Sequence, residues 1–369
     1  MKLTYTYFTI VDSVVFFLLF ILPFAILPFG TSEFETPKVL LAEAGIIMLC
    51  IISLIGHKTS LVIRSPLYVA IIGVFLLSCI TAIFFPSQLL IFGNAFRMQG
   101  LFVLWFLLVF SIVSRTSSLR SVPWFVFGIL LGIQVVLTMF IATNESGRYV
   151  GTLGEPNALA SFAIFIWPFA FFAVKKFGKF ETIGMAIIFF FIGMLLFLTN
   201  SHSGLIALGI QLLFLMLQKF HIPRKKVVFI CLLVYLASYM LPFFQHIPYE
   251  NRTEVWKAAL YSGTKKPLLG NGFGNGEVAM HTAAVSLGLP IQYYYVDSGH
   301  NIFFDWFVQG GLVGVGLLCV IIYQTFVKAI KEHDTRQVTL LFGMLTVLSF
   351  NPASIVGLLG FWWIIGQAL

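Results

Sequence analysis

Long apolar segments with almost no charge follow one another along nearly the whole chain. They fall at about 8–29, 38–56, 66–86, 99–114, 122–142, 158–174, 182–199, 204–219, 227–246, 301–327, 337–350 and 352–367. A helix of roughly 20 apolar residues spans the hydrocarbon core of a bilayer. Only 10% of the 369 residues are charged, against about 25% in soluble domains. We therefore predict an all-α, polytopic transmembrane helix bundle of about twelve helices, in which residues 1–369 form a single domain.

The lysines and arginines are distributed unequally between alternate loops. Fifteen of the 22 lie in one set of loops: Lys2, Lys58, Arg64, Arg115, Arg120, Lys175, Lys176, Lys179, Lys219, Arg224, Lys225, Lys226, Lys328, Lys331 and Arg336. The other seven lie in the alternate set: Lys38, Arg97, Arg148, Arg252, Lys257, Lys265 and Lys266. Because cytoplasmic loops carry the excess of basic residues, we expect both termini in the cytoplasm. This bias explains the net charge of +8 without nucleic acid as a partner, and it makes the longest loop, residues 247–300 between the ninth and tenth segments, extracytoplasmic.

The long loop contains a predicted amphipathic helix followed by a glycine-rich turn. In the helix, predicted over 251–260, Trp256 and Leu260 share one face. In the turn, residues 270–276, we single out Gly272 and Gly274, because glycine adopts positive φ and lets the backbone approach a ligand closely. Consecutive N–H groups in such a turn can cradle an anion. The alternative interpretation is a flexible turn without a ligand, and no Gly-Lys-Ser/Thr follows to make it a P-loop.

His300, Asn301 and Asp305 lie where the long loop runs into the next apolar segment. A histidine at the mouth of a helix can act as a general base near neutral pH, although an interfacial histidine is the alternative. Asp305 lies about one turn inside the apolar segment, where a carboxylate needs a partner. We expect Asp305 to orient His300 or to pair with an arginine. The glycine run at 310–314 indicates close helix packing.

Three arginines on the predicted extracytoplasmic side are candidates for binding an anion. Arg97, Arg148 and Arg252 all lie in loops between the apolar segments. The guanidinium fork suits phosphate oxygens, and two or more arginines can hold a diphosphate. The alternative for each is a side chain that snorkels to the interface or forms an ion pair with Glu145 or Glu155.

Asn157 and His202 complete the candidate set. Asn157 ends the segment 148–157 ahead of the sixth apolar segment, and His202 lies in the turn between the seventh and eighth. A histidine can donate a hydrogen bond to phosphate. Glu277 and His281 share a helix face but lack a third ligand, and the four cysteines all fall inside apolar segments. We therefore expect neither a metal site nor a cofactor.

In their order along the chain, these motifs resemble the O-antigen ligase/polymerase superfamily. That superfamily includes O-antigen ligases, O-antigen polymerases and protein O-oligosaccharyltransferases. The resemblance covers about 90–365 and is most specific in 250–315. It rests on Arg252 with Trp256, residues 267–274 (Pro-Leu-Leu-Gly-Asn-Gly-Phe-Gly), His300-Asn301, residues 310–314 (Gly-Gly-Leu-Val-Gly), and the segments 148–157 and 97–100.

The resemblance implies a metal-independent, inverting glycosyltransferase whose donor is a glycan on a polyprenyl diphosphate, typically undecaprenyl diphosphate. It implies that His300 engages or deprotonates the acceptor hydroxyl. It also implies that Arg252 binds the diphosphate and stabilises the leaving group. One position departs from the pattern, because the family usually carries an arginine where this chain has His202, and a histidine is not reliably charged at pH 7.

Together, the residues and the resemblance favour an O-antigen ligase-like transferase of the bacterial inner membrane. It would act in lipopolysaccharide or other surface polysaccharide biosynthesis, with membrane lipids around it and a lipid, glycan or protein as acceptor. A polysaccharide polymerase and a protein O-oligosaccharyltransferase are the alternatives within this class. A transporter or flippase for lipid-linked sugars is the alternative of another class, although no inverted repeat is visible in the sequence.

Overall fold

The computed structural model describes residues 10–27, 32–56, 65–119, 122–141, 143–144, 147–174, 181–220, 222–241, 252–289 and 297–369. Its helices are Ile10–Phe24, α2 (Glu35–Ile55), α3 (Pro66–Phe84), α4 (Leu101–Val113), α5 (Trp124–Phe140), α6 (Pro156–Val174), α7 (Glu181–Thr199), α8 (His202–Leu217), α9 (Arg224–Ser238), α10 (Arg252–Lys265), α11 (Gly276–Ser286), α12 (Ile302–Lys331), α13 (Thr335–Leu348) and α14 (Ile355–Gly366). Apart from an isolated bridge between Thr143 and Tyr149, the described residues contain no β-structure. The prediction of an all-α fold is confirmed.

Each predicted apolar segment coincides with a helix. Six helices, namely α2, α3, α6, α7, α8 and α12, are long and apolar enough to cross a membrane. The first helix and α4, α5, α13 and α14 are shorter but also apolar. The amphipathic helix predicted at 251–260 corresponds to α10, which is followed by α11 in the long loop.

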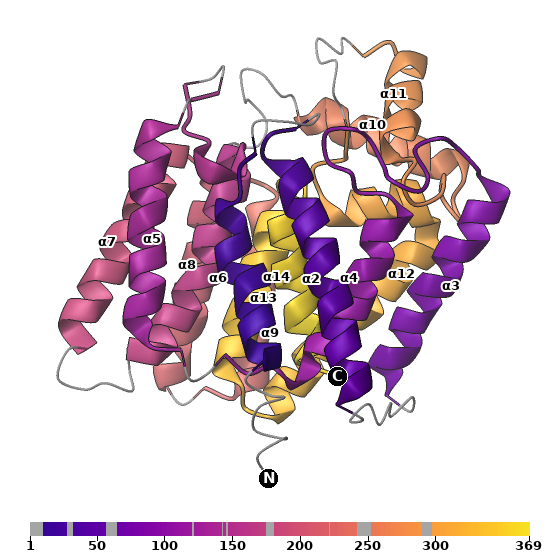
Figure 1. The fold of residues 1–369 in the computed structure, drawn as a ribbon. Coiled ribbons are helices and arrows are strands. Elements are labelled where there is room, and N and C mark those ends of the chain that lie inside the picture. Colours follow the sequence, from indigo (N-terminus) through magenta and orange to yellow (C-terminus); the bar gives the residue numbers. More distant parts are fainter. Residues whose placement is uncertain are drawn as a thin grey trace.

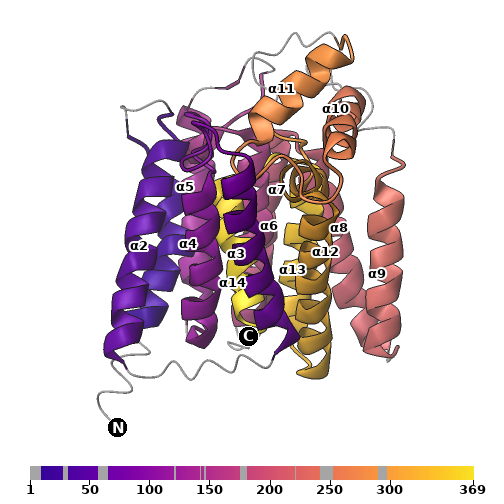
Figure 2. The ribbon, with the colours of Figure 1, turned by 90° about the vertical axis from the view of Figure 1, so that its right-hand side faces the viewer.

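The centre of the bundle is formed by α6, α13 and α14 (Figures 1 and 2). Nearly every side chain of α13 and α14 is buried, Trp362 and Trp363 among them. With 14 and 12 residues, these two helices are about 21 and 18 Å long, shorter than the hydrocarbon core of about 30 Å. The turn that joins them, residues 349–354, is enclosed by protein, with Ser349 and Asn351 both buried.

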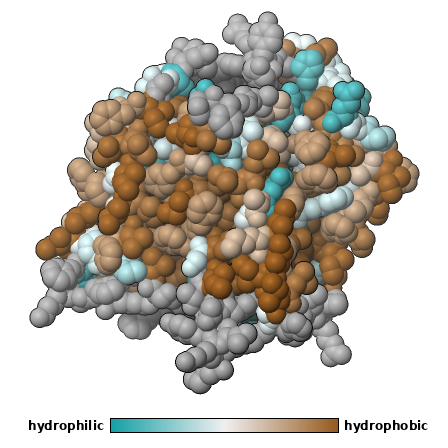
Figure 3. All heavy atoms as spheres, in the orientation of Figure 1, coloured by the Kyte–Doolittle hydropathy of each residue, from teal (hydrophilic) through white to brown (hydrophobic). Residues whose placement is uncertain are grey.

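Apolar side chains cover much of the lateral surface of the bundle (Figure 3). Ile83, Phe140 and Phe197 expose 78%, 85% and 79% of their surface. Water-soluble proteins rarely expose contiguous apolar patches of this extent, whereas lipid tails accommodate them. The fold is that of a membrane protein.

The two ends of the bundle differ in what they carry. α10 and α11 lie at one end, opposite the C-terminus (Figures 1 and 2). The first helix, darkest in colour, begins at the end that carries the C-terminus (Figure 1). This arrangement agrees with the predicted separation of the long loop from both ends of the chain.

Helix α12 is interrupted at Gly311, where φ is 63° and ψ is −161°. This backbone conformation is nearly exclusive to glycine. The N–H groups freed by the interruption, those of Leu312 and Val313, donate to the carbonyl oxygens of Pro267 and Leu268 at 2.7 and 3.2 Å. The close helix packing predicted at the glycine run is confirmed, because Gly310 and Gly314 lie against Leu77 of α3, while Gly311 packs against the loop after α10.

Replacing Gly311 with alanine is expected to destabilise the protein. The conformation alone costs a non-glycine residue about 1–3 kcal/mol, and a Cβ atom at this position lies 2.3 Å from the carbonyl oxygen of Leu268. Gly316→Ala in the same helix is the matched control, because its Cβ meets no atom within 4 Å. Thermal denaturation in detergent should show a lower midpoint for Gly311→Ala alone. Equal midpoints for the two variants would contradict the interrupted helix.

Candidate functional site

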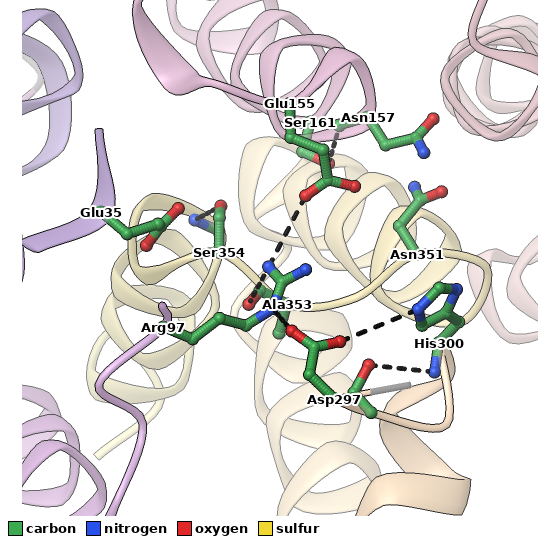
Figure 4. Close-up of polar contacts among 12 residues, drawn as sticks. Glu35, Arg97, Glu155, Asn157, Ser161, Asp297, His300, Asn351, Ala353 and Ser354 are labelled. Carbon is green, nitrogen blue, oxygen red and sulfur yellow. Dashed lines mark hydrogen bonds and ion pairs between the residues drawn. The ribbon is translucent and has the colours of Figure 1, made fainter. Parts of the chain in front are cut away.

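The candidate site surrounds the buried turn 349–354, close to the end of the bundle that carries α10 and α11. Arg97, in the segment between α3 and α4, donates from its Nε to Asp297 Oδ2. Its Nη1 lies 3.6 Å from Glu155 Oε2 and 3.5 Å from the carbonyl oxygen of Ala353 (Figure 4). Arg97 therefore joins three loops and the turn through one guanidinium group.

A third carboxylate, that of Glu35 at the start of α2, faces this group. Its Oε2 accepts the N–H of Ile355 at 3.3 Å. Burial alone lowers the pKa of Arg97, but the neighbouring carboxylates of Asp297, Glu155 and Glu35 outweigh this effect and raise it. Arg97 is therefore permanently charged. We refer to Glu35, Arg97, Glu155 and Asp297 as the carboxylate–arginine cluster, in which three carboxylates surround one cation.

His300 lies beside Asp297, in the turn that leads into α12. Its Nε2 is 3.9 Å from Asp297 Oδ1, and the residue is only 5% exposed. The backbone at His300 has a positive φ of 50°. Asp305 Oδ1 accepts the N–H of Gly299, so this carboxylate holds the turn that presents the imidazole ring. Asp305 thus helps to position His300 through the backbone of the preceding residue.

A chain of hydrogen bonds begins at Arg148, on the other side of the turn. Its Nη2 donates to Asn157 Oδ1 at 2.9 Å, and its Nε donates to the carbonyl oxygen of Thr199 at 2.7 Å. The hydroxyl of Ser201 donates to the same Asn157 Oδ1 at 3.1 Å, and it lies 3.1 Å from the hydroxyl of Ser203. Residues from two loops are in this way brought to the start of α8.

The same chain of hydrogen bonds ends at Arg252, the first residue of α10. Asn351 Nδ2 donates to the hydroxyl of Ser203 at 2.7 Å, and Arg252 Nη2 donates to Asn351 Oδ1 at 3.4 Å. The positive charges of Arg148 and Arg252 both act on His202. The arginine–amide network, as we name it, consists of Arg148, Asn157, Ser201, Ser203, Asn351 and Arg252.

Asn351 is the junction between the network and the histidine. Figure 4 shows its side chain between Asn157 on one side and the ring of His300 on the other. The guanidinium groups of Arg148 and Arg252, which hydrogen-bond to the amides of Asn157 and Asn351, therefore lie on one side of the turn 349–354. On the other side lie the histidine and the carboxylate–arginine cluster. The site is divided by charge.

A cavity of about 120 Å³ opens next to the carboxylate–arginine cluster. Its polar part is lined by Arg97, Asp297 and Glu277. Its apolar part is lined by side chains of α4, α12 and α14, which are Leu104, Leu107, Ile302, Trp306, Leu358 and Trp362. The cavity therefore suits an amphiphilic molecule with a hydroxyl-bearing polar end.

Gly272 and Gly274 take the positive φ values predicted for them, 94° and 89°. Their N–H groups, however, donate to the backbone carbonyl and side-chain oxygens of Gln309, both at 2.9 Å. A Cβ at Gly274 lies 2.5 Å from the carbonyl oxygen of Leu90. These glycines hold the loop against its neighbours and do not present N–H groups to an anion, although Gly274 also lines the cavity.

Asn301 and Trp256 hold neighbouring segments in place. Asn301 caps the start of α12, and its Nδ2 donates to the carbonyl oxygen of Ser349 at 2.8 Å. The ring of Trp256 packs against Tyr239 and Phe304, with centroids 6.0 and 5.6 Å apart. Asn301 therefore supports the turn 349–354, and Trp256 supports the first turn of α12, just after His300.

Several residues of this site were not predicted from the sequence, among them Asp297 and Asn351. Asp297 lies three residues before His300, and Asn351 is an amide within an apolar hairpin. No pattern in the sequence predicts that Asp297 pairs with Arg97 or that Asn351 bonds to Arg252. Of the two glutamates predicted as alternative partners for the arginines, Glu155 pairs with Arg97, and Glu145 lies outside the described residues.

Comparisons with models of known protein families and with curated protein sequences find no match to this chain. The resemblance noted from the motifs therefore stays a prediction. Within the part of the chain that the structure describes, no group of three or more His, Cys, Asp or Glu side chains is arranged to hold a metal ion.

Arg97→Gln is expected to destabilise the folded protein. It removes the guanidinium from Asp297, and breaking one side of a buried ion pair costs about 3–5 kcal/mol. The side chains of Arg97 and Asp297 are 11% and 7% exposed, so water screens this pair little. Thermal denaturation of the double variant Arg97→Gln/Asp297→Asn should recover much of the loss. A double variant no more stable than Arg97→Gln would argue against the pairing.

Proposed function

We propose that this protein is a glycosyltransferase that moves a glycan from a polyprenyl diphosphate carrier to an acceptor hydroxyl. The observation that carries the proposal is the division of the site by charge around the turn 349–354. One side offers the arginine–amide network to an anionic leaving group. The other side offers a buried histidine, backed by a carboxylate, to a hydroxyl nucleophile.

The arginine–amide network is the proposed site for the donor diphosphate. Breaking the bond between the sugar and the diphosphate requires fixed positive charge directed at the departing oxygens. Arg148 and Arg252 can supply it through charge-assisted hydrogen bonds, with His202 as a further donor between them. Arg97 is a weaker candidate than the sequence indicated, because Asp297 and Glu155 already balance its charge.

His300 is the proposed general base. It accepts the proton of the acceptor hydroxyl, while Asp297 orients the ring and stabilises the imidazolium that forms. The acceptor oxygen then forms a bond to the anomeric carbon, the bond from that carbon to the diphosphate breaks, and polyprenyl diphosphate leaves with the electron pair. Attack from the side opposite the leaving group inverts the anomeric configuration.

The cavity beside the carboxylate–arginine cluster is the proposed acceptor site. Its acidic polar part repels phosphate, so it favours the hydroxyl-bearing end of the acceptor over the donor diphosphate. Its apolar part, along Leu104 and Leu107 of α4, can take an apolar portion of the same molecule. An O-antigen ligase-like reaction is our first hypothesis. A polymerase or a protein O-oligosaccharyltransferase differs from it only in the acceptor.

We further propose that the chain crosses the bacterial inner membrane about twelve times, with the site at the extracytoplasmic face. The orientation rests on the sequence, because fifteen of the 22 lysines and arginines lie in one set of alternate loops. No nucleotide is needed at that face, since the diphosphate linkage of the donor supplies the driving force.

His300→Ala and Arg252→Ala should each abolish turnover in purified, folded protein. Loss of a general base costs about 10²–10⁴-fold in rate, and loss of a donor that stabilises developing negative charge costs about 10²–10³-fold. The measurement is release of polyprenyl diphosphate from a polyprenyl diphosphate-linked glycan. Asp297→Asn should retain more activity than His300→Ala, because its role is to orient the base.

Two variants on α10 and α11 serve as matched controls. His281→Ala removes an exposed histidine, and Lys257→Ala removes an exposed cation one turn after Arg252. Both should retain the activity of the unaltered protein. Unimpaired turnover in His300→Ala and Arg252→Ala would reject the mechanism. Movement of intact donor across proteoliposomes without release of polyprenyl diphosphate would favour the transporter alternative.

The proposed orientation predicts which cysteines an impermeant reagent can reach. In a chain whose four cysteines are replaced by serine, Ser286→Cys on α11 should be labelled from outside intact spheroplasts. Lys331→Cys, at the C-terminal end of α12, should be labelled only after the membrane is opened. The reverse pattern would place the donor and the candidate site on opposite leaflets, and would remove the basis of the proposed function.

A further inference from the structure

A second and larger hollow, of about 700 Å³, lies between α10, α11 and the segment that follows α3. We refer to it as the α10–α11 groove. Tyr261 and Lys265 line it from α10, Val278 and Thr282 from α11, and Phe85 from the end of α3. Two of its walls, α10 and α11, lie together at the end of the bundle opposite the C-terminus (Figures 1 and 2).

The walls of the groove are tied together by the side-chain amides of Asn275 and Asn271. Asn275, 7% exposed, donates from its Nδ2 to the carbonyl oxygens of Phe85 and Asn271, both at 2.9 Å. The hydroxyl of Ser87 donates to Asn275 Oδ1. Asn271 Nδ2 in turn donates to the hydroxyl of Ser262 on α10 at 3.1 Å. The shape of the groove is therefore fixed by hydrogen bonds between all three of its walls.

The charge of the groove is positive. Lys265 and Lys266 line it, and none of the described residues that line it is acidic. The Nζ atoms lie over aromatic rings, at 4.7 Å from the centroid of Tyr261 and 3.9 Å from that of Phe85. Cation–π contacts of this kind steady an ammonium group but leave its charge available to an anion.

Exposed apolar side chains border the groove. Ile83 and Phe84 at the end of α3 are 78% and 66% exposed, and Val278 and Val285 on α11 are 51% and 64% exposed. A basic groove bordered by exposed apolar side chains is typical of a protein surface at the boundary between lipid headgroups and acyl chains. A water-soluble anion has no apolar part that could contact these exposed side chains.

We propose that the α10–α11 groove binds the phosphate headgroup of an anionic membrane lipid, independently of the proposed transferase function. The lysines bind the phosphate, the hydroxyls of Tyr261 and Thr282 form hydrogen bonds with the polar headgroup, and the acyl chains lie along α3. Residues 271–276 form the wall between this groove and the cavity of the candidate site. A bound lipid therefore supports one wall of that cavity.

The test measures lipid affinity of the full chain in a neutral detergent. The protein is titrated with phosphatidylglycerol that carries a fluorescent acyl chain, and separately with phosphatidylcholine that carries the same chains, and the two affinities are compared. We expect tighter binding of phosphatidylglycerol, and a loss of about tenfold in its affinity in Lys265→Gln/Lys266→Gln, since each lysine near a membrane surface contributes substantially to anionic lipid binding. Thr282→Trp, which fills the groove and keeps both lysines, should weaken binding as well.

Lys257→Gln is the matched control, because it removes an exposed lysine of α10 that does not line the groove. All the altered side chains are exposed, and size-exclusion chromatography verifies that each variant folds. Unchanged affinity in the double variant, or an equal loss in Lys257→Gln, overturns the proposal. Complete competition by an equal concentration of glycerol phosphate overturns it too, because the site would then belong to a soluble anion. Absence of such competition supports the lipid.

Discussion

The interior of a bilayer offers no water to polar groups, so every polar atom in this bundle has to find its partner within the protein. Lys38 meets this constraint by donating to the carbonyl oxygens of Ala25, Phe34 and Thr152, at 2.7–2.8 Å. Gln211 meets it by bonding α6 and α13 from α8. Polar side chains in the core thus form hydrogen bonds between helices. Apolar contacts alone do not fix the position of one helix along its neighbour.

The same constraint explains why the candidate site forms where it does. Because α13 and α14 are too short to reach from one end of the bundle to the other, their joining turn brings backbone carbonyls and Asn351 into a buried region. Arg97, Gln99 and Asn301 donate to the carbonyls of this turn, and Ser203 accepts from Asn351. A turn that requires polar partners has therefore gathered arginines, carboxylates and a histidine around it.

Sequence reasoning found part of the site because some of its signals are local. The positions of Arg252 and His300 were predicted from loop composition and from the resemblance over about 90–365. The partner of Arg97 did not follow, because Asp297 is 200 residues away and only packing brings the two together. The glycine-rich loop was predicted to adopt positive φ, which it does, but its N–H groups bond to Gln309 of the interrupted α12. No local pattern reveals that interruption.

By itself, the sequence determined the all-α architecture, the approximate limits of the apolar helices and the placing of the candidate residues in loops or in the first turns of helices. These properties depend on hydrophobicity, chain length and charge summed over neighbouring residues, which a sequence displays directly. The tertiary structure alone decided how the charges divide, with Arg97 among carboxylates and Arg148 and Arg252 joined through Asn351. That division depends on which loops meet around one buried turn, and such meetings are set by packing between helices far apart in the chain.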